Sequence, residues 1–185
     1  PMFPENFRNE VQVVNTVLSV EQDNSPELTA MFGSSLATSI SEVPFDGPIA
    51  GVKVGHVDGN FIINPTPEEL EKSDLDLTVA GTKEAINMVE AGASEVSEAE
   101  MHKALVFGHQ NIIELCKFQL EIAAQCGKEK VKPLLFVTDK EIDSEVRAYA
   151  EEDLVKAIRI EDKLLRYQAI DEVNARTLEE FGKKV

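Results

Sequence analysis

The carboxylates Asp74 and Asp76 are the pair whose spacing most directly suggests chemistry in this sequence. On a β-strand, side chains two positions apart point to the same face. Two carboxylates on one face can hold Mg²⁺ together with the phosphate groups of a substrate. The pattern is short and arises often by chance, so a solvated strand face is the more frequent alternative. Both interpretations require a strand at this position.

Three basic residues form a second candidate site. Arg159, Lys163 and Arg166 follow one another at spacings of four and three positions. On a single helix these spacings place the side chains on one face, where they are candidates to clamp an RNA backbone. The alternative is that they pair with neighbouring acids such as Glu161 and Asp162, as on an ordinary solvated helix.

A helix start at Ser25 is a third candidate, because a helix N-terminus can bind an anion. Pro26 has no backbone N–H to donate, and Glu27 places negative charge where a phosphate would lie. We therefore expect a structural cap, in which the Ser25 side chain accepts hydrogen bonds from free backbone amides.

The histidines and cysteines do not suggest a metal site or a disulfide. His56, His102 and His109 are scattered and there is no CxxC pair, so no zinc site is expected. Cys116 and Cys126 are ten residues apart in a predicted helix. That spacing separates them by roughly 15 Å along the helix axis, too far for a disulfide. They are interpreted as reduced core thiols of a cytoplasmic protein.

The formal net charge of −16 is unevenly distributed. Residues 1–131 contain 21 acidic and 8 basic residues, a net charge of −13, whereas residues 132–185 contain 13 and 10, a net charge of −3. Contact with phosphates requires a positive field, so a strongly acidic body argues against broad, non-specific binding to nucleic acids. Any RNA contact must therefore be local. The absence of a stretch of about 18 apolar residues and of a secretion-signal pattern predicts no membrane association.

Hydrophobic patterns predict an α+β body with several antiparallel strands and two helices, followed by a small helical domain without strands. The predicted strands lie at residues 11–17, 49–57, 61–63, 74–79 and 85–91, with hairpin turns at 58–59 and 81–83. The first helix begins at Pro26. The second begins at Ser97, where Glu100 completes a capping box, and ends at Gly127. Its predicted buried stripe is Met101, Leu105, Ile112, Leu115 and Ile122.

The region beyond Pro133 has a helical pattern throughout. One helix begins within residues 138–141 and places five apolar residues on one side, namely Ile142, Val146, Ala150, Leu154 and Ala157. Another helix carries the apolar residues Leu164, Tyr167, Leu178 and Phe181. The composition changes at residues 128–133, which predicts a boundary between the two regions there.

Four segments together resemble the polynucleotide phosphorylase family: PENFRNEVQVVNTVLSVEQDNSPEL, PFDGPIAGVKVG, INPTPEELEKSDLDLTVAGTKEAINMVEAGA and VFGH. The resemblance covers nearly the whole chain and rests on long ordered strings. It implies that residues 1–131 are the C-terminal part of the first RNase PH-like domain (ribosomal protein S5 domain 2-like). Residues 132–185 are then the start of an all-helical linker or RNA-binding domain. The abrupt beginning of the chain predicts a fragment of a larger protein.

The resemblance also implies a function. The family that this chain resembles consists of Mg²⁺-dependent 3′ to 5′ exoribonucleases that use phosphate and act in mRNA degradation. In the reverse reaction they polymerise nucleoside diphosphates. Its members are expected in the cytoplasm as ring-shaped homotrimers that bind RNA, and in RNA-degrading assemblies. The family's catalytic site belongs to the second RNase PH-like domain, so this chain is expected to supply a scaffold.

Three positions of the active copy can be compared with this sequence. Where that copy has a metal-binding Asp, a second Asp and a Lys, this chain has Leu70, Asp76 and Thr78. Residues 23–27 replace its serine-rich phosphate turn. The resemblance therefore implies that Asp76 and its neighbour Asp74 are vestigial, and that this chain holds no catalytic residue, metal or cofactor. Two alternatives are a Mg²⁺-dependent phosphoryl-transfer site in this chain and a stand-alone RNA-binding module.

Overall fold

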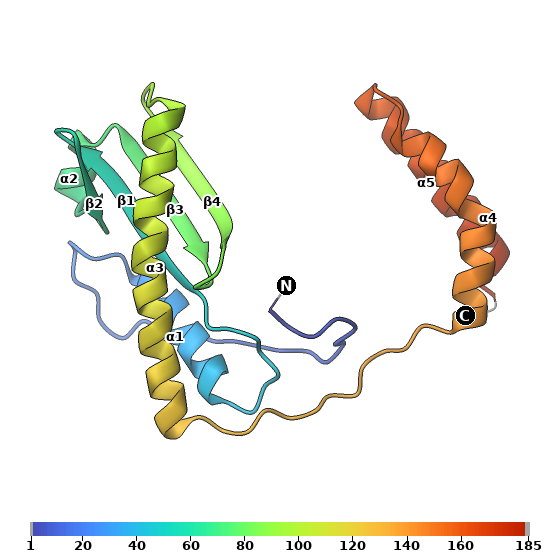
Figure 1. Cartoon of the computed structure of the whole chain (residues 1–185), viewed down its shortest axis with the longest axis horizontal. Coiled ribbons are helices and arrows are strands. Elements are labelled where there is room, and N and C mark those ends of the chain that lie inside the picture. The colour runs from blue at the N-terminus through green and yellow to red at the C-terminus, as the bar shows by residue number, and fades with distance from the viewer. Residues whose placement is uncertain (1, 184–185) are drawn as a thin grey trace. The chain divides into compact units, whose positions relative to one another are not determined.

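The computed structural model describes residues 2–183. Pro1, Lys184 and Val185, at the outer ends of the two predicted regions, lie outside the described residues. The chain divides into two compact units, Pro1–Leu135 and Phe136–Val185. Each is described by itself (Figure 1).

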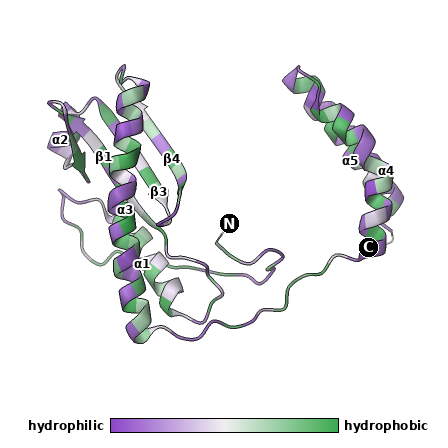
Figure 2. Ribbon diagram, in the orientation of Figure 1, coloured by the Kyte–Doolittle hydropathy of each residue, from purple (hydrophilic) through white to green (hydrophobic). Residues whose placement is uncertain are grey.

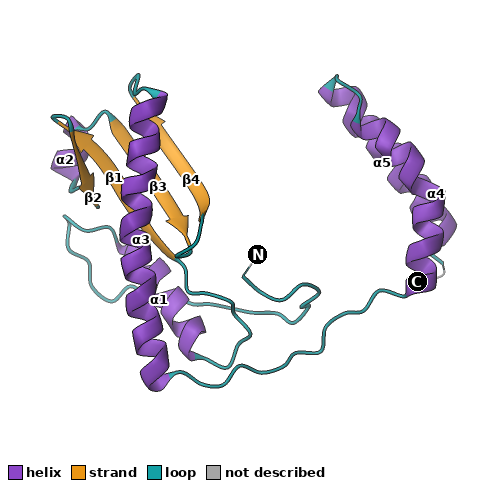
Figure 3. Ribbon diagram, in the orientation of Figure 1, coloured by secondary structure: helices purple, strands orange, loops and turns teal. Residues whose placement is uncertain are grey.

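An antiparallel sheet of four strands lies at the centre of the first unit (Figure 3). The strands are β1 (Ala50–Val57), β2 (Asn60–Ile63), β3 (Leu75–Gly81) and β4 (Ile86–Ala93), in the spatial order β2-β1-β3-β4. The predicted hairpin turn between β1 and β2 is confirmed, because its two residues have the positive φ angles of 49° and 77° that a two-residue turn needs.

Helix α3 (Glu98–Cys126) covers one face of this sheet. The side chain of Ser97 accepts a hydrogen bond from the backbone N–H of Glu100, which is one half of the predicted capping box, and the helix ends before Gly127, as predicted. The Glu100 carboxylate pairs with Lys103 instead of closing the other half. Gly108 brings the helix backbone close to the sheet, because a Cβ at this position would lie 3.1 Å from the Val54 side chain. Of the predicted stripe, Ile112 is fully buried and the others are half-buried. Small or polar side chains occupy much of the line of closest contact, which comprises Ala104, Gly108, Ile112, Cys116 and Gln119.

Two further helices, α1 (Pro26–Ile40) and α2 (Pro67–Lys72), contact strand β1 of the sheet. A Cβ at Gly51 of β1 would lie 2.6 Å from the sulfur of Met31 on α1. Because Gly51 alternates with Val52, which packs toward α3, Met31 lies on the opposite face. Part of that face is therefore left open between α1 and α2.

The prediction of a strand over residues 11–17 is wrong. The segment is extended but is not part of the sheet (Figure 1). Its valines remain in water, with exposed fractions of 47% for Val13, 73% for Val14 and 55% for Val17. A strand requires a neighbour that pairs with its backbone, and no described residue of the chain does so here. The composition of the segment favours a strand, but a strand forms only where the backbone pairs with a neighbour.

The second unit is a hairpin of two helices, α4 (Lys140–Ile158) and α5 (Lys163–Phe181). Both begin with an aspartate cap: Asp139 accepts from two backbone amides and Asp162 accepts from the amide of Leu165. The five apolar residues predicted to share one side of α4 are all buried or half-buried. That prediction is confirmed.

The second helix predicted for this region is confirmed, because α5 carries all four of the apolar residues assigned to it. Phe181 is buried, but Leu164, Tyr167 and Leu178 are exposed by 78%, 53% and 71%. Val173, with 8% exposure, faces α4 instead. Two helices share only one line of contact, so apolar residues on other sides stay in solvent. Figure 2 shows hydrophobic and hydrophilic residues mixed along both helices.

Candidate functional site

A cleft lies on the sheet face opposite α3. Its volume is about 890 Å³, and it is bounded by the start of α1, by α2 and by strands β1, β3 and β4. Its floor includes a row of side chains from three neighbouring strands, in which Thr78 of β3 lies between Lys53 of β1 and Glu90 of β4. The row places an ammonium and a carboxylate on either side of a neutral hydroxyl.

Asp76 lies in the next row of the same floor, between Gly55 and Gly92. Neither neighbour has a side chain that covers it, and the Asp76 side chain is 46% exposed. Its Oδ1 atom lies 3.6 Å from the Nζ atom of Lys53. An ion pair this exposed contributes little to stability, but it gives the carboxylate a counter-charge from the protein itself.

Asp74 has a different partner. It precedes β3, and its Oδ1 atom lies 2.8 Å from Nδ1 of His56 on β1. The His56 ring packs on Phe61, with 4.9 Å between the ring centroids, and its side chain is only 14% exposed. The two carboxylates are thus held separately, Asp74 by His56 and Asp76 by Lys53. Within residues 2–183, no cluster of three or more His, Cys, Asp or Glu residues is arranged to hold a metal.

The positions assigned by the resemblance to an active site are brought together. Leu70 from α2, Asp76 and Thr78 from β3, and residues 23–27 all line the one cleft. Segments up to about 50 positions apart in the sequence therefore meet at one cleft. These are the positions that correspond, by the resemblance, to the metal and phosphate ligands of the active copy. At the three compared positions the side chains are an aliphatic group (Leu70), a carboxylate (Asp76) and a hydroxyl (Thr78).

The start of α1 differs from the expected cap. The Ser25 side chain makes no capping hydrogen bond, so that prediction is wrong. Its hydroxyl donates instead to the carboxylate of Glu27, which lies two positions further along the helix. Pro26 occupies the first helical position. The carboxylate thus engages the serine hydroxyl and leaves negative charge at the end of the helix that attracts anions.

The charges in the cleft are mostly negative. Five carboxylates line it, and one ammonium, that of Lys53, opposes them, so the formal balance is 1 − 5 = −4. The carboxylates belong to Glu21, Asp23, Glu27, Asp76 and Glu90. A phosphate entering the cleft would meet a field of its own sign.

The three basic residues do not lie on one helix face, so this part of the prediction is wrong. Arg159 is the residue that ends α4, and Lys163 begins α5, with a turn between them. The Nη1 atom of Arg166 donates to the carbonyl oxygens of Ile160 and Glu161 at 2.8 Å and 3.0 Å. Arg166 therefore closes the turn between the two helices, and this explains its position without RNA.

Two functional contacts escaped the sequence analysis. Lys53 was not singled out, and His56 was considered only as a zinc ligand, yet both supply the partners of the two aspartates. Both lie on β1, and β2 and α2 intervene in sequence before β3. A hairpin signal predicts pairing between consecutive strands, but no local signal places β1 beside β3.

The cysteines are free, as expected. Cys116 is buried in α3, where its Sγ atom lies 3.7 Å from the carbonyl oxygen of Pro48. Burial raises the pKa of the Cys116 thiol, and the nearby charge of Glu84 adds to this. The thiol is therefore held in its protonated, unreactive form. Cys126 is exposed near the end of the same helix, so the prediction that it is a core thiol is wrong.

The fold and the cleft define a domain of the RNase PH class. The family described as "3' exoribonuclease family, domain 2" matches residues 47–111. The crystal structure of rice (Oryza sativa) Rrp46 superposes with a TM-score of 0.50 at 14% sequence identity, covering 57% of this chain and 51% of that chain. At that identity the likeness concerns the fold alone.

Three bacterial relatives are all named polyribonucleotide nucleotidyltransferase. The chain is 56% identical to that of Brevibacillus brevis over 184 residues, which is 100% of this chain and 26% of the relative. The identity is also 56% to the proteins of Listeria welshimeri and Bacillus subtilis, which cover 100% and 98% of this chain. The resemblance to the polynucleotide phosphorylase family is confirmed, and the chain spans about a quarter of the length of these relatives.

Within residues 2–183, none of the helices combines the length and the apolar character that crossing a bilayer requires.

Proposed function

We propose that this chain is a non-catalytic scaffold within a polyribonucleotide nucleotidyltransferase, a phosphate-dependent 3′ to 5′ exoribonuclease. Residues 1–131 are the C-terminal part of its first RNase PH-like domain, and residues 132–185 begin its all-helical domain. The proposal rests on the similarity along the whole chain and on the composition of the cleft.

The cleft carries the main argument. A phosphorolytic site needs cationic or hydrogen-bonding groups that stabilise the charge of a transferring phosphoryl group. Here Leu70 and Thr78 occupy two of the three compared positions, and Lys53 is paired with Asp76. The net charge of −4 around the cleft opposes the approach of both phosphate and an RNA 3′ end.

The whole protein has requirements that this chain does not supply. We expect the complete enzyme to use Mg²⁺ and inorganic phosphate, to form a homotrimer around RNA, and to act in the cytoplasm within an RNA-degrading assembly. In that setting the first unit supports the architecture of the trimer, and the second unit guides RNA.

A phosphorolysis assay tests the scaffold proposal. The chain is incubated with a short 5′-labelled oligoadenylate, Mg²⁺ and inorganic phosphate, and the shortening of the RNA is followed. We expect no phosphate-dependent shortening. Asp76→Asn is compared with Asp58→Asn, which removes the same charge from an exposed hairpin turn outside the cleft. Turnover that disappears with Asp76→Asn and persists with Asp58→Asn would establish a Mg²⁺-dependent site in this chain and overturn the proposal.

Local RNA binding by the second unit is the second candidate function. It is favoured by the weaker negative charge of residues 132–185, a net of −3. Arg159 and Lys163 are both exposed, whereas Arg166 is engaged with backbone carbonyls. If these residues contact RNA, replacing Arg159 and Lys163 by Ala weakens binding and flattens its dependence on salt. Unchanged affinity and salt dependence would remove this function.

A further inference from the structure

Consecutive carbonyl groups at the end of α1 accept hydrogen bonds from one short segment of the linker that follows α3. The donors lie in residues 128–131, which the chain reaches just after it leaves α3 (Figure 1). We refer to residues 128–131 as the clamp segment. The carbonyl groups that it contacts belong to Thr38, Ser39, Ile40, Ser41 and Glu42.

The clamp segment uses both backbone and side-chain donors. The backbone N–H groups of Lys128 and Val131 donate to the carbonyl oxygens of Ile40 and Glu42, each at 2.9 Å. Between them, the Lys130 ammonium donates to the other three carbonyl oxygens at 2.7 to 2.9 Å. A helix leaves its last carbonyl groups without partners of its own, and its dipole favours a cation there. The linker therefore caps α1 from a distant part of the sequence.

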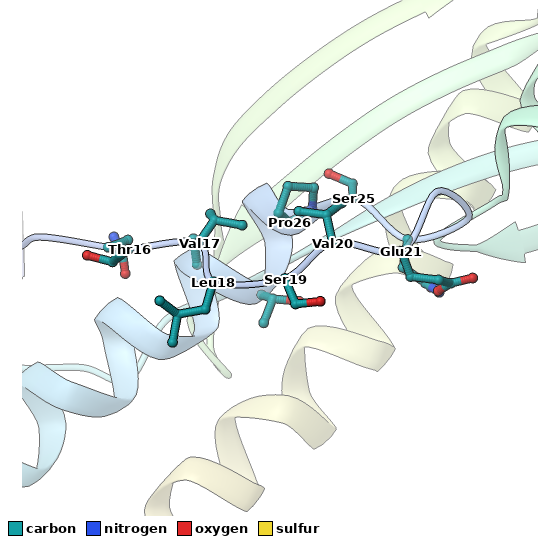
Figure 4. Close-up of a pocket in the computed structure, with 12 residues that line it drawn as sticks. Thr16, Val17, Leu18, Ser19, Val20, Glu21, Ser25 and Pro26 are labelled. Atoms are coloured by element: carbon teal, nitrogen blue, oxygen red, sulfur yellow. The ribbon is translucent and has the colours of Figure 1, made fainter.

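Helix α1 is itself anchored to the first unit through its middle turns. The buried side chain of Ser35 accepts a hydrogen bond from the backbone N–H of Ile49 at 2.9 Å. The ring of Phe32 stacks on Phe118 of α3, with 6.1 Å between the ring centroids. At the start of the helix, by contrast, a cavity of about 450 Å³ lies between residues 15–21 and the first turns (Figure 4). A segment that is held to the end of α1 is therefore held to the sheet and to α3 as well.

The sequence ends the clamp segment after Val131. Pro133 has no backbone N–H, so a further bond of the same kind cannot form at that position. Proline also restricts the residue before it, Lys132, to an extended backbone. The donors and acceptors of the clamp all belong to residues 38–42 and 128–131 of this chain. Its formation therefore does not depend on what lies beside the rest of the linker.

We propose that the clamp segment fixes the point at which the chain leaves the first unit, and that the Lys130 ammonium is the group that holds it in place. The freedom of the second unit to reorient then begins after Val131. Removing the ammonium releases residues 128–131, so that this freedom begins at the end of α3 instead. The consequence for guiding RNA rests on the proposed function, whereas the clamp does not.

The test measures backbone order parameters and amide exchange of the ¹⁵N-labelled chain by NMR. In the unaltered chain, we expect residues 128–131 to have order parameters of about 0.85, as rigid backbone does. In Lys130→Met, we expect these values to fall below about 0.6, which is typical of flexible backbone. The Lys128 amide should exchange roughly tenfold faster or more, because its bond to Ile40 opens once the ammonium is gone.

Two matched variants separate the ammonium from the loss of any lysine. Lys132→Met removes an exposed ammonium just beyond the clamp segment and should change neither measurement. Lys130→Arg keeps the charge and the donors, so it should retain the order and the slow exchange. The amide of Leu77 in β3 reports whether the first unit remains folded. If Lys130→Met opens β3, the same criteria are applied to the milder Lys130→Gln, which keeps a polar donor without the charge.

Two results would overturn the proposal. One is a clamp segment that is already flexible in the unaltered chain, and the other is a segment that stays rigid without the Lys130 ammonium. None of the variants changes a residue of the cleft, so either result leaves the proposed function untouched. Phosphate-dependent shortening of RNA would overturn the scaffold proposal and leave the clamp in place.

Discussion

Lys130 holds the end of α1 from outside the helix, and its removal gives the sharpest prediction about stability. Its Nζ atom donates to the carbonyl oxygens of Thr38, Ser39 and Ser41 at 2.8, 2.9 and 2.7 Å. Helix α1 has no basic residue in its own last turn. The Lys130 ammonium therefore satisfies carbonyl groups that the helix leaves unpaired, and it complements the negative end of the helix dipole.

The magnitude follows from these three contacts. A partly exposed hydrogen bond contributes about 1 kcal/mol net, so three bonds contribute about 3 kcal/mol. Burial lowers the pKa of the Lys130 ammonium, which means that desolvation opposes its charged form. We therefore expect Lys130→Met to lower the free energy of unfolding of the first unit by about 2 kcal/mol. The thioether keeps most of the apolar stem of lysine, so the loss reports the charged group.

Hydrogen exchange measured by mass spectrometry at α1 is the appropriate assay. A loss of about 2 kcal/mol corresponds to roughly thirtyfold faster exchange. Both tyrosines lie in the second unit and the chain has no tryptophan, so tyrosine fluorescence in urea follows the second unit separately. It should be unchanged. The matched control is Lys128→Met, because Lys128 contacts Ile40 through its backbone amide, which the substitution keeps. Equal exchange in Lys130→Met and Lys128→Met would refute the reasoning.

Three further predictions concern single residues. Arg166→Met should lower the free energy of unfolding of the second unit by about 1–2 kcal/mol, whereas Lys163→Met should change it by less than about 0.5 kcal/mol, as measured by tyrosine fluorescence in urea. The hydrogen bond from Arg176 lowers the pKa of Asp153. This carboxylate therefore contributes stability that is complete above its unfolded pKa and is lost as the pH falls from about 4 through the lower folded value. Thermal melts of Asp153→Asn should lack this part of the acid sensitivity; an unchanged pH profile would contradict it. Gly108→Leu should destabilise the first unit by about 1–3 kcal/mol in hydrogen exchange, because its side chain has no room against the sheet.

Much of the first unit could be predicted from local signals. The Asp58-Gly59 pair defines a hairpin because both residues tolerate the backbone that the turn requires. The alternation of Leu75, Leu77 and Val79 identifies the buried face of β3, and all three are at most 1% exposed. In each case the structural cause lies within a few positions of the residues concerned.

The failures have non-local causes. Residues 11–17 have a strand composition, but a strand forms only where another segment pairs with its backbone. The pairing of Lys53 with Asp76 depends on β1 lying beside β3, which no consecutive pattern specifies. The break between α4 and α5 is different, because a local signal was present. Asp162 caps α5, and this type of residue is typical of helix starts.

The positions of the cleft were predicted through the resemblance, whereas its charge could only be known from the structure. Comparison with an active copy identifies Leu70, Asp76 and Thr78, and the fold brings these residues together. Glu90 and Glu21 belong to other segments and carry no motif. Their contribution to the field of the cleft depends on where β4 and the segment before α1 lie.

Strand β3 separates the side chains that stabilise the fold from those that line the cleft. Its side chains alternate, so Leu75, Leu77 and Val79 enter the core beneath α3 while Asp76 and Thr78 face the cleft. A substitution on the cleft face leaves the buried contacts intact, because the two sets of side chains lie on opposite faces of the strand and do not pack against each other. Removing a cleft carboxylate or lysine therefore has little effect on the core that stabilises the sheet. Under the proposed function, the same strand retains the packing needed for a scaffold without the residues needed for phosphoryl transfer.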